Sequence, residues 1–181
     1  MESLVSSSCC SDDSSNSVSV TRNSSVRVIG CIFTGLGKYG DFSYMIQQPE
    51  FSDTLFVFND NEEQFCSYMN GDRTGIACTR GGGNAIIRSY QCLTIPRAVG
   101  IPTGVAGKGY EQLDSRVCKI IDQAIERIKN LISSGFYSEI LFSQDPDRET
   151  LGSGIFNPCD DVKIYIYKVL IGINQFGGIT S

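Results

Sequence analysis

The sequence contains no histidine. Its absence excludes histidine-based catalytic triads, imidazole acid–base steps and histidine metal sites. Any catalysis must therefore use aspartate, glutamate, lysine, cysteine or tyrosine side chains, a bound water, or a group of the substrate itself.

Long apolar runs and clusters of positive charge are also missing. No segment is long and apolar enough to predict a membrane span, and the N-terminus lacks the basic and apolar parts of a signal peptide. The net charge is −5, whereas coating nucleic acid or an anionic membrane needs clustered lysine and arginine. We therefore expect an intracellular protein, cytoplasmic or nuclear, with no membrane partner and no general binding of nucleic acid.

The eight cysteines form no CxxC pair and no metal-finger spacing. This pattern predicts neither a metal site nor a cofactor. Because no secretion signal is present, we expect reduced thiols. Several cysteines stand among apolar residues, as Cys118 does before Ile120 and Ile121, and this setting is typical of small core side chains.

Two regions differ in composition. Residues 1–23 are crowded with serine and hold few apolar side chains, so they cannot bury enough surface to offset the entropy of ordering. We interpret them as a disordered tail. Residues 24–181 are long enough for one domain with a sizeable core.

Strand and helix patterns alternate along this domain. Such alternation predicts a three-layer α/β/α fold with a mixed, largely parallel sheet. Apolar runs predict strands at 26–33, 54–58 and 139–143, with a brief strand at 99–101; helical periodicity predicts helices at 62–69 and 111–134, and a last helix, or alternatively a strand, at 160–171.

Two glycine clusters stand out. Gly81, Gly82 and Gly83 precede a short apolar run, and residues 152–156 repeat the design as Gly-Ser-Gly-Ile-Phe. Glycine permits positive φ and close approach of the backbone to a ligand. A helix that starts behind such a loop offers free N–H groups to an anion. Two such loops at helix starts predict a phosphate cradle.

The polar and glycine clusters follow the predicted strands. In open α/β sheets, ligands bind beyond the carboxyl ends of the strands. We therefore expect the binding site at that edge of the sheet.

Four motifs, in this order, resemble those of the macro domain, the family that binds ADP-ribose and related nucleotides. The resemblance covers roughly residues 26–170. The motifs are Gly-Asp-Phe at 40–42, the strand end at 58–61, the glycine loop at 81–87, and the final loop at 152–156 after the helix at 111–134 and the strand at 139–143.

The resemblance implies a macro-domain-like fold and a set of ligand contacts. Asp41 would accept the adenine amino group, with Phe42 against the ring, and the glycine loops would wrap the distal ribose and the diphosphate. The expected binding residues are Asp41, Phe42, Asn59, Gly81, Gly82, Gly83, Gly152, Ser153, Gly154, Ile155 and Phe156.

The resemblance also implies a reaction, the hydrolysis of an ADP-ribose linkage by an activated water. The candidates to activate that water are Asn61, Asn84 and Asp60. The partner would be a nucleotide resembling ADP-ribose, free or attached to a macromolecule. The sequence leaves open whether the chain hydrolyses this ligand or only binds it.

The chain departs from the family pattern in three places. Asn59 and Asn61 are separated by one residue where the family has two, Asn84-Ala85 replaces an acid and a glycine, and residues 144–151 lengthen the connection before the final loop.

Two other functions fit the sequence. The chain could be a non-enzymatic interaction protein whose tail or loop at 144–149 contacts a partner. It could also be a metal-dependent nucleotide-processing enzyme, since aspartates in a loop can hold Mg²⁺. The candidate ligands are Asp145, Asp147, Asp160 and Asp161.

Deleting residues 1–23 should leave folding intact, because this segment lacks the apolar pattern needed to dock on a core. Thermal unfolding of the truncated chain should give a midpoint within a few degrees of the full-length value. A larger drop would mean that the tail packs on the domain.

Overall fold

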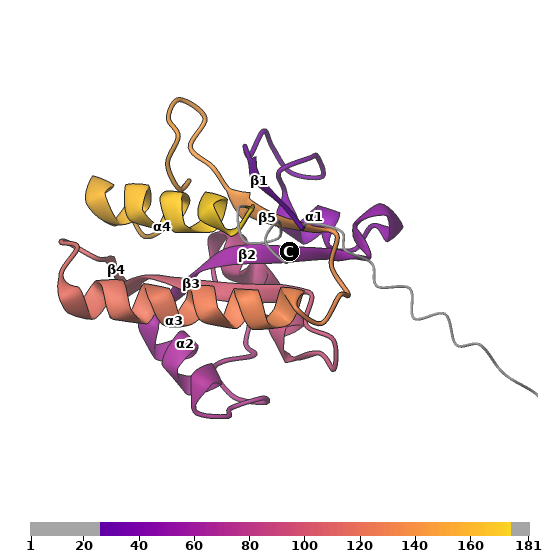
Figure 1. Cartoon of the computed structure of the whole chain (residues 1–181), viewed down its shortest axis with the longest axis horizontal. Helices are drawn as coiled ribbons and strands as arrows, with labels where there is room; N and C mark the ends of the chain where they lie inside the picture. Colours follow the sequence, from indigo (N-terminus) through magenta and orange to yellow (C-terminus); the bar gives the residue numbers. More distant parts are fainter. Residues whose placement is uncertain (1–25, 175–181) are drawn as a thin grey trace, which may run out of the picture.

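The computed structural model describes residues 26–174, so the predicted tail lies outside the described residues. Figure 1 shows the arrangement of its elements. In chain order they are β1 (Arg27–Cys31), α1 (Phe42–Met45), η1 (Pro49–Phe51), β2 (Thr54–Asn61), α2 (Glu62–Met69), η2 (Gly83–Cys92), β3 (Ala98–Val105), β4 (Lys108–Gly109), α3 (Ser115–Ile132), β5 (Glu139–Ser143) and α4 (Asp160–Gly172).

The five strands form one sheet in the order β1-β5-β2-β3-β4. The pairs β1/β5, β5/β2 and β2/β3 are parallel, and only β4 runs antiparallel to its neighbour β3. The sheet is therefore mixed and largely parallel, as the sequence predicts. The central strand β2 is buried on both faces, which explains its unbroken apolar run.

Helices cover both faces of the sheet. Leu55 and Val57 of β2 pack into a core shared with α2, α3 and α4, whereas Phe56 and Phe58 point to the opposite core, shared with α1 and η2. Figure 1 shows α3 and α4 running along the same side of the sheet. Because neighbouring side chains of a strand point to opposite faces, this alternation produces the three-layer architecture.

Several predicted elements match the structure closely. The bounds of α2 and β5 are those expected, and α4 is a helix rather than a strand. Helix α3 begins at Ser115, later than predicted, because the Asp114 carboxylate accepts the Val117 N–H at 2.8 Å and caps the helix there.

Strand β3 has eight residues where the sequence predicts only 99–101. Its glycines and proline suggested a loop. In the structure Gly100 leaves room for the Asp60 side chain, since a Cβ there would lie 2.4 Å from Asp60 Oδ2. The strand then turns through Ala106 and Gly107, both at positive φ, into β4.

The expectation of reduced thiols is wrong for two cysteines. Cys78 and Cys92 form a disulfide, although they are 14 residues apart and share no spacing motif. Cys31, Cys66, Cys118 and Cys159 are free. Cys118 is half-buried on the flank of α3 rather than in the core, because Val117 and Ile121 occupy the core-facing positions.

Within residues 26–174, no helix is long and apolar enough to cross a membrane. The described helices instead pack against the sheet through one face. Helix α3 is the clearest case, with Val117, Ile121 and Ile128 buried and the opposite face exposed.

Replacing Ile128 by alanine should destabilise the domain by about 2–5 kcal/mol, because Ile128 is fully buried and its loss leaves a cavity under α3. Gln123→Ala is the matched control, since Gln123 is exposed on the same helix. Urea unfolding followed by circular dichroism measures both. Similar losses for the two variants would contradict the assignment of the α3 core face.

Candidate functional site

A cavity of about 700 Å³ lies at the edge of the sheet where the parallel strands end. Its walls come from the loops after β1, β2 and β5 and from the two glycine loops. The lining includes Phe33 and Leu36 after β1, Asn59 and Asn61 at the end of β2, Gln144, Asp145 and Pro146 after β5, and residues 81–86 and 152–156.

The fold brings together almost all the residues selected from the sequence. They come from four separate segments, yet each segment contributes to the lining of this one cavity. The predicted residues that line it are Asp41, Phe42, Asn59, Asn61, Gly81, Gly82, Gly83, Asn84, Gly152, Ser153, Gly154, Ile155 and Phe156. Asp60 does not line the cavity.

Asn59 ties the two glycine loops to the end of β2. Its backbone N–H donates to Asn84 Oδ1 at 3.0 Å, and its Nδ2 donates to the Gly152 carbonyl at 2.9 Å. One residue therefore positions a loop 25 residues downstream and another 93 residues downstream.

The two loops also touch each other directly. A Cβ added at Gly82 would lie 2.5 Å from Ile155 Cδ1, and one at Gly83 would lie 3.4 Å from it. Gly83 has φ of +57°, a conformation that favours glycine. Only residues without side chains allow this approach of the loops.

The two glycine loops differ in how they connect to the helices that follow them. The first loop leads directly into η2, which begins at Gly83. The second does not cap α4, because residues 157–159 intervene and Asp160 and Asp161 fill the first turn of that helix. The predicted helix start behind the second loop is therefore wrong. In the second loop, the backbone N–H groups of Ser153, Gly154 and Ile155 donate to no backbone carbonyl within residues 26–174.

Asp41 is buried and caps α1. Its Oδ1 accepts from the Ser43 N–H at 3.0 Å and the Ser43 hydroxyl at 2.7 Å, while Oδ2 accepts from the Gly37 N–H at 2.8 Å. Burial raises the pKa of Asp41, but these hydrogen bonds outweigh it and hold the pKa below its usual value. Asp41 is thus a fixed anion whose position the loop determines.

Aromatic and aliphatic side chains form one side of the cavity. Phe42 is 3% exposed and packs edge-on against Phe56, so it contributes mainly to the core. Phe156 is half-buried. Phe33 and Leu36, which the sequence analysis did not select, are 56% and 82% exposed at the rim. The sequence signal that could have identified them is their apolar character in a loop directly after β1.

Asp60 lies beneath the site, with 0% exposure, and forms an ion pair with Arg88. Its Oδ1 accepts from Arg88 Nη2 at 2.6 Å and Nε at 2.9 Å, and from the Asn61 N–H at 2.9 Å. Burial raises the pKa of Asp60, and the Arg88 charge only partly offsets it. In this arrangement Asp60 positions Arg88 and does not face the cavity.

Arg88 is the cation that the sequence analysis missed. It lines the cavity under the first glycine loop, and a Cβ at Gly81 would lie 2.9 Å from its guanidinium. Its Nη1 donates to the Thr79 carbonyl at 2.9 Å. A lone arginine next to Ile87 in an apolar segment was the signal, because a buried arginine requires an acid nearby.

Two amide oxygens at the end of β2 lack donors. Asn59 Oδ1 and Asn61 Oδ1 are buried without a hydrogen-bond partner within the described part of the chain. The Asn61 Nδ2 group is fixed by Gln64 Oε1 at 2.6 Å, which orients its oxygen. An unpaired buried acceptor is unfavourable, and both of these asparagines belong to the cavity lining.

The acidic residues considered as magnesium ligands do not gather. Arg148 lies between two of them, with its guanidinium 3.2 Å from Asp160 and 3.9 Å from Asp145. Across residues 26–174, no group of three or more acidic or cysteine side chains is placed to hold a metal ion. The donor set needed for the metal-dependent alternative is therefore not assembled there.

No protein-family model, curated protein or solved structure matches the chain. The macro-domain resemblance therefore depends on the sequence motifs and their order alone.

Replacing Arg88 by methionine should cost about 3–5 kcal/mol of stability at pH 7, because it leaves the Asp60 carboxylate buried and unpaired. Without Arg88, the pKa of Asp60 in the folded state lies further above its unfolded value. The folded state then binds the extra proton, so stability falls as pH rises through the folded pKa. The loss should be smaller near pH 4 than at pH 7.

Urea unfolding over this pH range provides the measurement. The control is the double variant Asp60→Asn/Arg88→Met, which lacks the titrating carboxylate and should show no such pH dependence from this site. An Arg88→Met loss that stays constant from pH 4 to 7 would contradict the role of the ion pair.

Proposed function

We propose that the chain binds ADP-ribose or a closely related nucleotide in this cavity. The observation that carries the proposal is the convergence of the two glycine loops, both tied to Asn59, on a single cavity. A volume of about 700 Å³ lies within the ~300–1,000 Å³ range of small-molecule sites.

The diphosphate would lie between the loops. Anions bind well to convergent backbone N–H groups that no side chain crowds. Ser153, Gly154 and Ile155 supply N–H groups with no backbone acceptor in the described chain, and Gly82 and Gly83 expose backbone that no side chain of their own covers. Arg88 beneath the loop adds a positive charge that Asp60 largely balances, so recognition relies on hydrogen bonds rather than on a strong cation.

The nucleoside would extend toward Asp41. This carboxylate is an acceptor for an amino group, and the rim residues Phe33 and Leu36 offer an apolar surface for a ring. Ribose hydroxyls would lie near the amides of Asn59 and Asn61, which line the cavity. The chemistry of the cavity thus matches a ligand with a base, hydroxyls and phosphates.

Hydrolysis of an ADP-ribose linkage is the catalytic form of this proposal. Asn61 and Asn84 line the cavity, whereas the Asp60 carboxylate is held by Arg88. Asn84 Oδ1 already accepts from the Asn59 N–H, so in this proposal Asn61 would be the residue that orients a water. Binding does not depend on this step.

Gly154→Glu tests the position of the phosphates. A side chain at Gly154 meets nothing within 4 Å, so the variant should fold. Its carboxylate would lie against the ligand's charge, and two like charges 4 Å apart repel by about 4 kcal/mol at an effective dielectric near 20. ADP-ribose affinity should fall by about a hundredfold or more, since about 1.4 kcal/mol is a factor of ten. Calorimetry gives the value.

Gly154→Gln is the matched control, because it has the same shape without the charge. It should retain most of the affinity. Adenosine, which lacks phosphates, should respond equally to both variants if it binds. Unchanged ADP-ribose affinity in Gly154→Glu would place the phosphates elsewhere.

A thermal-shift series with ADP-ribose, AMP, NAD and Mg²⁺ separates the alternatives, because only a ligand that favours the folded state raises the unfolding midpoint. Stabilisation by Mg²⁺ alone would favour a metal-dependent enzyme. No response to any of the four would favour an interaction protein.

A further inference from the structure

The Cys78–Cys92 disulfide closes a covalent ring around the first glycine loop. The two cysteines are 14 residues apart, and the segment between them holds Gly81, Gly82, Gly83 and Arg88. All four of these residues line the cavity, whereas neither cysteine does. One wall of the candidate site is therefore a loop whose two ends are joined by a single bond.

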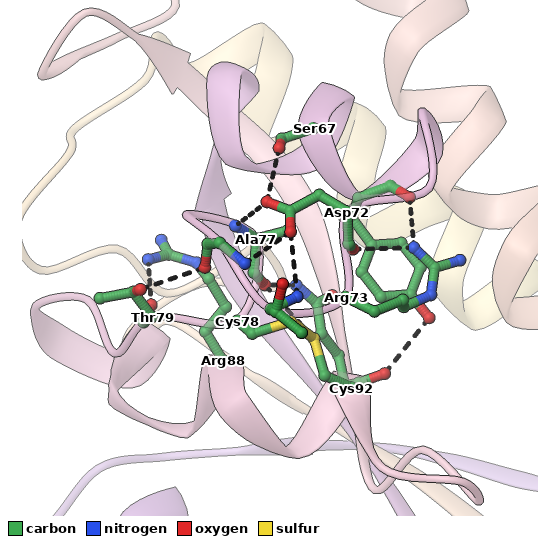
Figure 2. The surroundings of a disulfide bond; sticks show 12 residues. Ser67, Asp72, Arg73, Ala77, Cys78, Thr79, Arg88 and Cys92 are labelled. Atoms are coloured by element: carbon green, nitrogen blue, oxygen red, sulfur yellow. Dashed lines mark hydrogen bonds between the residues drawn. A yellow bond between two sulfur atoms is a disulfide. The ribbon is translucent and has the colours of Figure 1, made fainter.

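The bond lies at the base of this loop, where Figure 2 shows it beside Ala77, Thr79 and Arg88. Cys78 and Cys92 are both half-buried, and neither lines the cavity. Reaction at the disulfide does not require an empty binding site.

The segments on either side of the ring have their own anchors. Before it, the Asp72 carboxylate accepts from the Ser67 hydroxyl at 2.8 Å and from the Ala77 N–H at 3.1 Å (Figure 2). At the other end, just inside the ring, the Tyr68 hydroxyl donates to the Gln91 carbonyl at 3.2 Å. These hydrogen bonds hold the two ends near each other but, unlike the covalent bond, can open transiently.

Inside the ring, the contacts are fewer. Arg88 donates to the Thr79 carbonyl at 2.9 Å, and the Gly81 N–H donates to the Ala85 carbonyl at 3.0 Å. Residues 79–82 are mostly exposed, so no buried side chain anchors this stretch. The second half of the ring is held by the Arg88–Asp60 ion pair and by the hydrogen bond from the Asn59 N–H to Asn84, and the disulfide is the covalent restraint on the exposed stretch that precedes them.

We propose that Cys78 and Cys92 form a redox-sensitive site that regulates ligand binding in the cavity; this rests on the proposed function.

A dithiol reductant attacks one sulfur through its thiolate, forms a mixed disulfide and releases the other cysteine. Its second thiol then frees the first cysteine. Two electrons and two protons pass to Cys78 and Cys92, and the reductant becomes a cyclic disulfide. The reduced loop is freer and must be ordered by the ligand, which weakens binding.

Hydrogen exchange and calorimetry on the full chain, with and without dithiothreitol, test the proposal. Thiol titration verifies the release of two thiols per chain. The backbone amides of residues 79–85 should exchange at least about tenfold faster after reduction, because the loop can then open locally without the covalent constraint of the disulfide. The Kd for ADP-ribose should rise about tenfold. The variant Cys78→Ser/Cys92→Ser should behave like the reduced protein and not respond to dithiothreitol.

Cys118→Ser is the matched control, since it removes a half-buried free thiol on α3 and should behave like the parent. Unchanged exchange and unchanged affinity after verified reduction would overturn the proposal. If ADP-ribose binds neither form, the proposed function fails, and the exchange of residues 79–85 still decides whether the disulfide restrains the loop. If the double variant does not fold, the reduced parent protein provides the same comparison.

Discussion

The Arg88 guanidinium meets the fully buried Asp60 carboxylate at 2.6 Å, and this ion pair joins β2 to η2 under the cavity. Much else in the structure depends on it. A buried charge is tolerated only when it is paired, so a shift of η2 would leave the buried Asp60 carboxylate without its partner. Gly100 of β3 leaves the space that Asp60 needs. The position of η2 in turn sets the course of the glycine loop that precedes it.

Above this pair, Asn59 joins the two loops that form the walls. Its side chain and backbone hold Gly152 and Asn84, and Ile155 closes against Gly82. Where the two glycine loops form the wall of the cavity, that wall is largely backbone, and side chains from the sheet edge keep it in place. Such a surface suits an anion, because N–H groups fixed in advance need little reorganisation when the ligand arrives.

The sequence predicted much of the fold and about half of the residues that line the cavity. Helix α2 and strand β5 have the expected bounds because their periodicity is local. The location of the cavity follows from a general rule for parallel strands. By contrast, β3 was predicted too short, because Gly100 and Pro102 suggest a loop unless the packing against Asp60 is known. The disulfide was not predicted either, because only the folded chain brings Cys78 and Cys92 together.

The sequence by itself determined the alternation of strands and helices, the absence of imidazole chemistry, and the glycines and amides at the strand ends. Only the tertiary structure decided what each group does. It made Asp41 a helix cap, placed Asp60 beneath the cavity, and paired Cys78 with Cys92. Backbone patterns depend on neighbouring residues, whereas burial and pairing depend on which segments pack together. The chemistry of a side chain can be read from its type, but its role depends on its surroundings in the fold.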